Sequence, residues 1–167
     1  VAPTGDYMSL ICFKNGSLAR EAICEAYGLD WSGFSEALRT TPAGNGGKIM
    51  LPYFEPEIVP NVLEPGVRRF DLAEDDVEGN CRAVVEAQML SMRLHSRWMD
   101  VEPLGIYATG GASANREILQ VMADVQQCPV HRFEVTNSAA LGAALRAAQG
   151  YLSDAGEASS WEEVVAG

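Results

Sequence analysis

Basic residues are scarce in this chain, and long apolar runs are absent. Its 12 Lys and Arg stand against 23 Asp and Glu, which gives a formal net charge of −11. A nucleic-acid or anionic-membrane surface needs a basic face, so the composition argues against both partners. No apolar run approaches the length that crosses a bilayer. A small phosphorylated ligand stays open, because backbone N–H groups at a helix N-terminus can hold a phosphate.

Signals for metals and disulfides are also missing. His95 and His131 are the only histidines, and neither lies at a metal-ligand spacing from a cysteine. The sequence has no Cys-x-x-Cys pair, and its four cysteines are far apart: Cys12, Cys24, Cys81 and Cys128. We therefore expect buried, reduced thiols in a cytoplasmic protein, with no disulfide and no zinc held by these side chains.

The size and composition fit one globular domain. The chain has 167 residues, of which 47% are hydrophobic, enough to form a core. It starts with VAPTGDY and stops at SSWEEVVAG, and neither reads as a natural end. We expect a fragment of a longer polypeptide, with one domain over residues 1–152, whose first strands are missing, and a loosely held tail over residues 153–167.

An alternation of helices and strands is expected along this domain. The first half predicts a buried strand at 7–14, helices at 18–27 and 30–39, a strand at 49–54 and an irregular surface excursion at 55–80. The second half predicts a helix at 80–99 capped by Asn80, a strand at 106–108, a helix at 116–125, a strand at 130–135 and an Ala-rich helix at 138–152. This order predicts α/β layers, in which ligands bind beyond the carboxyl ends of the strands.

The stretch 106–130 carries the main candidate site. Gly110 and Gly111 follow a short strand and precede a helix whose N-cap is Ser113 or Asn115. Adjacent glycines allow positive φ and leave no Cβ in the way of a flat ligand. The Asn115 amide offers a donor and an acceptor to a purine edge. These features indicate a nucleotide site, although a glycine pair between strand and helix is also typical of a simple turn.

Four other features each have two readings. Trp31, at the start of a helix, is either a packing residue or an aromatic wall for a purine ring. The glycine-rich loop TTPAGNGGK lacks the spacing of a P-loop, so we interpret it as a surface loop rather than a phosphate cradle. Glu86 is interpreted as an exposed carboxylate, because no catalytic partner is visible beside it. Gly142, inside a helix, predicts either close packing or close ligand approach.

Several longer segments resemble a known family. ATGGASANREILQVMADV followed by PVHRFEVTNSAALGAALRA resembles the adenosine-side signature of the FGGY carbohydrate kinases. YMSLICFKNGSLARE, WSGFSEAL and the GNGGK loop resemble the xylulokinase branch of that family. LPYFEPE departs from the LPYLSGERTP form common in bacterial members. The resemblance runs in order from about Asp6 to Gly150 and weakens over residues 55–80 and in the tail.

The resemblance implies a fold, a reaction and a set of site residues. The fold is α/β of the ribonuclease H-like, actin-type ATPase kind, a mixed sheet with helices on both faces, and this chain corresponds to most of the second, C-terminal domain. The reaction is phosphorylation of D-xylulose to xylulose 5-phosphate by ATP, with Mg²⁺ bound mainly through the nucleotide. Gly110, Gly111 and Asn115 fall on adenosine-contacting positions, and Trp31 falls on an aromatic position near the nucleotide.

The same resemblance places the chemistry outside this chain. The family's phosphate loop, catalytic aspartate and most sugar contacts belong to the N-terminal half, so we assign no catalytic residue here and expect the isolated chain to be inactive. ATP or ADP and a small sugar are the expected partners of the full-length protein, and a homodimer is left open. The alternatives are another FGGY kinase acting on ribulose, gluconate or glycerol, and a non-catalytic module that binds nucleotide or a protein partner.

Overall fold

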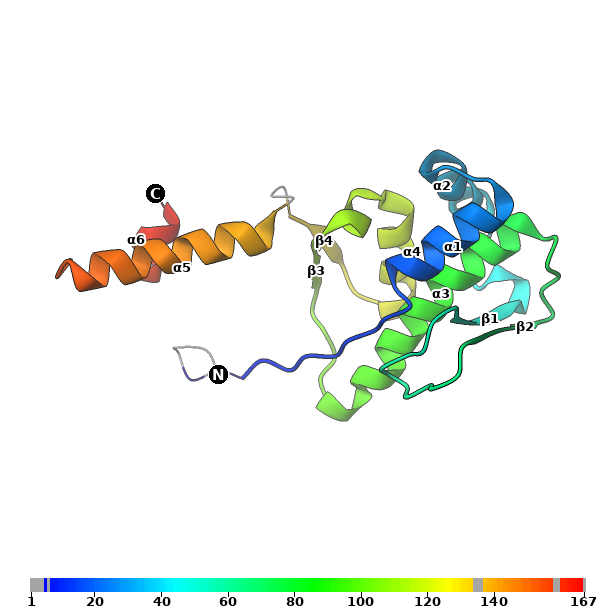
Figure 1. Ribbon diagram of the computed structural model, residues 1–167, viewed down its shortest axis with the longest axis horizontal. Coiled ribbons are helices and arrows are strands. Elements are labelled where there is room, and N and C mark those ends of the chain that lie inside the picture. Colours follow the sequence, from blue (N-terminus) through cyan, green and yellow to red (C-terminus); the bar gives the residue numbers. More distant parts are fainter. Residues whose placement is uncertain (1–4, 6, 134–136, 158–159, 167) are drawn as a thin grey trace.

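The computed structural model describes residues 5, 7–133, 137–157 and 160–166 and combines helices with short strands (Figure 1). The helices are α1 (Ser17–Tyr27), α2 (Trp31–Thr40), α3 (Val77–Ser96), α4 (Arg116–Gln126), α5 (Ser138–Asp154) and α6 (Trp161–Ala166). The strands are β1 (Ile49–Tyr53), β2 (Gly66–Phe70), β3 (Ile106–Ala108) and β4 (Val130–Arg132). Short 3₁₀ turns are η1 (Asn45–Gly47), η2 (Arg97–Met99) and η3 (Gly111–Ala114). Within these described ranges, every helix is too short or too polar to span a membrane.

Helix α3 is the centre of the core. Helices α1, α2 and α4 and strand β1 all pack against it, and Figure 1 shows the three helices gathered around α3. The largest fully buried apolar side chains come from all five elements: Ile23, Phe34, Leu38, Met50, Val84, Val85 and Val121. Burying a side chain of this size stabilises the fold by about 1.5–3 kcal/mol relative to leaving it exposed. This cluster therefore fixes the neighbouring elements against α3.

Local sequence signals explain where α1, α2 and α4 begin and end. Gly28 ends α1 in the left-handed conformation with φ +62°. Asp30 Oδ1 accepts the N–H of Gly33 at 2.7 Å and thereby caps α2. Of the two candidate caps for α4, Asn115 is the one that the structure uses. These three helices are confirmed close to their predicted bounds.

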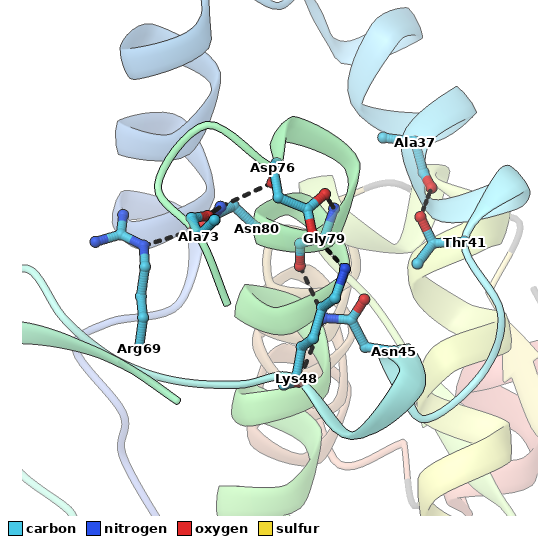
Figure 2. Close-up of polar contacts among 9 residues, drawn as sticks. All are labelled: Ala37, Thr41, Asn45, Lys48, Arg69, Ala73, Asp76, Gly79 and Asn80. Carbon is cyan, nitrogen blue, oxygen red and sulfur yellow. Dashed lines mark hydrogen bonds and ion pairs between the residues drawn. The ribbon is translucent and has the colours of Figure 1, made fainter. Parts of the chain in front are cut away.

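Helix α3 begins at Val77, before its predicted cap Asn80. Asp76 Oδ1 accepts the N–H of Gly79 at 3.0 Å, as Figure 2 shows. Asn80 lies within the first turn, where its amide donates to the Asp76 carbonyl oxygen at 2.8 Å and accepts from Arg69 Nε at 2.7 Å. The prediction of Asn80 as the cap is wrong, because the Asp76 carboxylate is the group that reaches a free N–H of the helix end.

The glycine-rich loop over residues 40–48 is anchored to α3. Asn45 is 3% exposed, and its Nδ2 donates to the Gly79 carbonyl oxygen at 2.9 Å. Lys48 Nζ forms an ion pair with Asp76 Oδ2 at 2.6 Å (Figure 2). The prediction of a surface loop is therefore wrong at Asn45, which satisfies the backbone where α3 begins.

Glu86 is buried, which contradicts its interpretation as an exposed carboxylate. Its Oε1 accepts the Gly44 N–H at 2.8 Å and the Arg82 Nε–H at 2.6 Å. Arg82 Nη1 also donates to the Leu38 carbonyl oxygen at 3.4 Å, and Arg82 Nη2 lies 3.8 Å from the Asp124 carboxylate. The Arg82–Glu86 pair therefore links α3 to the glycine-rich loop, to α2 and to α4.

The strands of the described residues form two separate pairs. β1 and β2 are antiparallel with Ile49 opposite Phe70, and β3 and β4 are parallel with Ile106 opposite Val130. This arrangement differs from the single mixed sheet that was expected, because within the described residues each pair keeps two open outer edges. Pro52 lies in β1, at such an edge, where a residue without an N–H donor is tolerated. Strand β2 lies in the region predicted to be irregular.

The segment over residues 7–14 does not form the predicted strand. It is an extended segment that leads into α1 (Figure 1), and Tyr7, Met8 and Leu10 are 89%, 80% and 75% exposed. A strand obtains its backbone hydrogen bonds from a neighbouring strand, and none of the described strands pairs with this segment. The prediction of a buried strand is therefore wrong.

Helices α5 and α6 lie apart from the helices around α3 (Figure 1). They pack against each other, and no described residue of α5 is buried. A Cβ added at Gly142 would meet no described atom within 4 Å outside the backbone of its own helix, so the close packing that was one of its two readings is not present among the described residues. The last predicted residues of the strand at 130–135 lie partly outside the described ranges.

Candidate nucleotide-binding site

A pocket of about 690 Å³ lies between the first turns of α1 and α2 and the N-terminal end of α4. This volume falls within the range of about 300–1,000 Å³ that is usual for small-molecule sites. The lining residues come from three short stretches: Ser17, Arg20, Glu21, Trp31, Ser32, Ser35, Gly111, Ala112, Ala114, Asn115, Arg116, Glu117 and Ile118. Three of the four predicted nucleotide-contacting residues are among them, whereas Gly110 is not and only precedes the lining residue Gly111 in the chain.

Trp31 forms an aromatic wall of the pocket. It is the first residue of α2 and is 48% exposed. Its ring meets the buried Phe34 ring edge to face, with centroids 5.6 Å apart and an interplanar angle of 76°. Trp31 thus packs on the core and still presents accessible surface, and a rigid ring of this kind loses little entropy on contact with a flat ligand.

The two glycines of the turn after β3 differ in role. Gly110 has φ +85° and ψ −179°, a conformation that is essentially restricted to glycine. Gly111 has no positive φ, and it lines the pocket. A Cβ added at either position would meet no described atom within 4 Å. Gly110 therefore shapes the turn, whereas Gly111 leaves open space at the pocket wall.

The Asn115 side chain makes more hydrogen bonds within the protein than its sequence position indicated. Its Oδ1 accepts the N–H groups of Glu117 at 3.0 Å and Ile118 at 3.2 Å, which caps α4. Its Nδ2 donates to Ser35 Oγ at 2.8 Å. Since the amide oxygen has two lone pairs and both are used, the side chain offers a ligand only the second N–H of Nδ2. The prediction of both a donor and an acceptor is corrected to a donor alone.

Ser35 joins two walls of the pocket, and sequence reasoning missed it. Its Oγ accepts from Asn115 Nδ2 and donates to the Trp31 carbonyl oxygen at 2.7 Å. One hydroxyl thereby connects α2 to the cap of α4. The available signal was its position four residues after Trp31, which places both side chains on one face of the helix.

The charges that line the pocket are balanced. Arg20 and Arg116 stand against Glu21 and Glu117. Burial lowers the pKa of Arg20, and the Glu21 carboxylate partly offsets this effect. The guanidinium stays protonated and donates through Nη1 to Gln88 Oε1 at 2.6 Å. A pocket without a dominant charge suits the uncharged nucleoside part of a nucleotide better than its phosphates.

Among the described residues that line this pocket there is no cysteine and no cluster of metal-binding side chains. The described residues contain no group of three or more His, Cys, Asp and Glu side chains that could hold a metal ion. All four cysteines are free; Cys24 and Cys81 are buried, whereas Cys12 is exposed and Cys128 half-buried, so the expectation of buried thiols is wrong at Cys12. Burial raises the pKa of Cys81 to about 12, so this thiol stays protonated and unreactive at neutral pH.

Comparison with known proteins gives this architecture a family. Residues 15–151 match the FGGY family of carbohydrate kinases, C-terminal domain. The xylulose kinase of Rattus norvegicus is 40% identical over 163 residues, a match that covers 92% of this chain and 30% of that protein. The chain therefore spans less than a third of the length of this relative.

Solved structures of sugar kinases share the fold. The ligand-bound xylulose kinase from Lactobacillus acidophilus has a TM-score of 0.76 at 22% identity, covering 91% of this chain and 32% of that chain. The gluconate kinase from the same organism has a TM-score of 0.74 at 22% identity, again covering 91% of this chain and 32% of that chain. The chain therefore belongs to the FGGY family of carbohydrate kinases, and residues 15–151 correspond to its C-terminal domain.

Proposed function

We propose that this chain is the ATP-binding C-terminal part of a sugar kinase that phosphorylates D-xylulose to xylulose 5-phosphate. The 40% identity to the rat protein named xylulose kinase supports the sugar and the reaction. One observation carries the nucleotide role: Trp31, Gly111 and Asn115, which come from separate elements, line the same pocket.

The proposed complex uses each wall in a distinct way. The adenine ring lies between the accessible surface of Trp31 and the backbone at Gly111, where no Cβ intervenes. The free Nδ2 N–H of Asn115 donates to an acceptor atom of the purine. Gly110 makes this geometry available by holding the turn in a conformation that other residues do not adopt.

The remaining chemistry belongs, on this proposal, to the part of the kinase outside this chain. Mg²⁺ binds mainly through the phosphate oxygens of ATP, which is its usual arrangement in kinases. A carboxylate base and most of the sugar contacts lie in the other domain. Because phosphoryl transfer depends on positioning and electrostatics, the contribution of this chain is to hold the nucleotide at the cleft.

The proposal includes the ribonuclease H-like, actin-type architecture for a domain over residues 1–152, followed by a tail. Its support is the order β3, α4, β4, in which two parallel strands are joined through a helix. Further strands beside this pair would complete the mixed sheet.

Gluconate is a second candidate substrate. The fold similarity to the gluconate kinase, with a TM-score of 0.74, nearly equals the similarity to the xylulose kinase of the same organism, with 0.76. A comparison of kcat/KM for xylulose and gluconate with the full-length protein decides between these two sugars.

Calorimetric titration of ADP into the 167-residue chain tests the nucleotide site. We expect the double variant Gly111→Val, Asn115→Ala to bind ADP at least about tenfold more weakly, since it fills the open space and removes the donor. The matched control is Gly142→Val, Asn137→Ala, which makes the same two changes in and before α5. If both double variants are folded by circular dichroism and bind ADP with equal affinity, the proposed nucleotide site is wrong.

A coupled assay tests the division of labour. We expect the full-length protein to turn over xylulose with ATP and the 167-residue chain to give no turnover. Xylulose phosphorylation by this chain alone would contradict the placement of the base and the sugar contacts outside it.

A further inference from the structure

We infer that Ser35 is a positioning residue for nucleotide recognition, because its hydroxyl accepts from the Asn115 amide and ties the cap of α4 to the backbone of α2 at Trp31. The inference rests on the proposed function of the same pocket. Ser35, a residue outside the glycine turn, thereby helps to determine which hydrogen-bonding group the pocket offers to a base.

The first step is the hydrogen-bond capacity of the serine hydroxyl. Ser35 has one proton, and the short 2.7 Å contact to the Trp31 carbonyl oxygen, which can only accept, uses it. Toward Asn115, at 2.8 Å, the same Oγ can therefore act only as an acceptor. This arrangement requires Asn115 to present Nδ2, not Oδ1, to Ser35.

The helix cap requires the same orientation of the Asn115 amide. The N–H groups of Glu117 and Ile118 both point at Oδ1, which must therefore be the carbonyl oxygen. A flipped amide would set its NH₂ against two donors and its oxygen against a hydroxyl with no proton to give. Two independent constraints thus hold one orientation, and the group left for a ligand is a single N–H.

The consequence is a defined chemical requirement on the ligand. The base must place an unprotonated acceptor, such as a ring nitrogen of adenine, opposite Asn115 Nδ2 while its ring contacts Trp31. Because Ser35 ties the Asn115 amide to the backbone carbonyl of Trp31, its loss frees the cap of α4 from α2, which weakens recognition of the base and leaves the phosphate contacts untouched.

Kinetics of the full-length protein provide the first test. We expect Ser35→Ala to raise KM for ATP about two- to tenfold, the cost of one hydrogen bond, with kcat and KM for the sugar unchanged. Ser35→Thr keeps the hydroxyl and should restore most of the ATP affinity. The control is Ser96→Ala, since Ser96 Oγ makes a similar bond within its helix, to the Arg93 carbonyl oxygen at 3.1 Å, and lies outside the pocket.

A ligand without a base separates positioning from general destabilisation. We expect Ser35→Ala to weaken binding of ATP and to leave binding of inorganic tripolyphosphate unchanged. Equal weakening of both ligands, or ATP affinity identical to that of the Ser96→Ala variant, would overturn the inference and leave the proposed function standing. Absence of ATP binding by the unaltered protein would overturn both.

Discussion

The helices around α3 and the outer pair α5 and α6 use apolar residues in opposite ways. α3 contributes Val84 and Val85 to a cluster with no solvent access, whereas the alanine-rich α5 has no buried residue among those described. The caps differ in the same sense. Asn115 accepts two N–H groups at the start of α4, and Asn137, at the equivalent position of α5, makes no such bond to a described residue. The contrast indicates that α3 and α4 are held by packing and capping, and α5 by intrinsic helix propensity.

Truncating one core side chain should strongly destabilise the helices around α3. Phe34→Ala is expected to lower the free energy of unfolding by about 3–5 kcal/mol, because Phe34 is 0% exposed and its loss leaves a cavity beneath Trp31. Leu141→Ala in α5, where the side chain is 43% exposed, should change it by less than about 0.5 kcal/mol. Urea unfolding of the two variants measures the difference. Similar losses would mean that the outer helices are part of the same cooperative core.

Removing a buried charge should have the next largest effect. Arg82→Ala leaves Glu86 buried without its partner and is expected to cost about 3 kcal/mol of unfolding free energy. Arg146→Ala removes an exposed arginine of α5 that donates to Gln149, and it should cost less than about 0.5 kcal/mol. If Arg82→Ala were as mild as Arg146→Ala in thermal unfolding, the link from α3 to α2 and α4 would carry no stability.

The smallest of these effects is expected from acid, which protonates Glu57 and weakens its contacts with the segment that leads into α1. Burial raises the pKa of Glu57, but N–H donors of Lys14, Asn15 and Ile58 outweigh it and hold the pKa below its usual value. The stabilisation is therefore complete above the unfolded pKa and is lost as the pH falls below it toward the folded pKa. We expect the Tm of the unaltered chain to drop more steeply between about pH 5 and pH 3 than that of Glu57→Gln. Parallel Tm profiles for the two proteins would contradict this role.

Local signals predicted the helices well, because caps and apolar periodicity act within one segment. The left-handed Gly28 and the caps Asp30 and Asn115 are side-chain or backbone features that a short window contains. Strands were less predictable, since pairing partners lie far along the chain. The segment 7–14 has strand composition and no described partner, and β2 has a partner that its irregular, proline-rich surroundings did not indicate.

The sequence predicted several residues of the candidate pocket, but not which hydrogen-bond donors and acceptors remain free for a ligand. Trp31, Gly111 and Asn115 were identified from the sequence, and the structure brings them to one pocket. The Asn115 oxygen accepts N–H groups of the α4 cap, and this use depends on where the helix begins. Ser35 lies against Asn115 only because α2 packs beside α4. Burial of Glu86 was missed for the same reason, although Arg82 at four residues' distance on the helix was an available sign.

The unequal glycines of the turn after β3 bear on how lineages of this domain can diverge. Gly110 is fixed by its own backbone angles, so selection for a folded chain is enough to retain it. Gly111 has no positive φ, and no described atom would meet a Cβ there, so on the proposed function the bound nucleotide is what opposes a larger residue at this position. On the proposed function, a descendant that no longer bound the nucleotide would keep Gly110 and accept larger residues at Gly111.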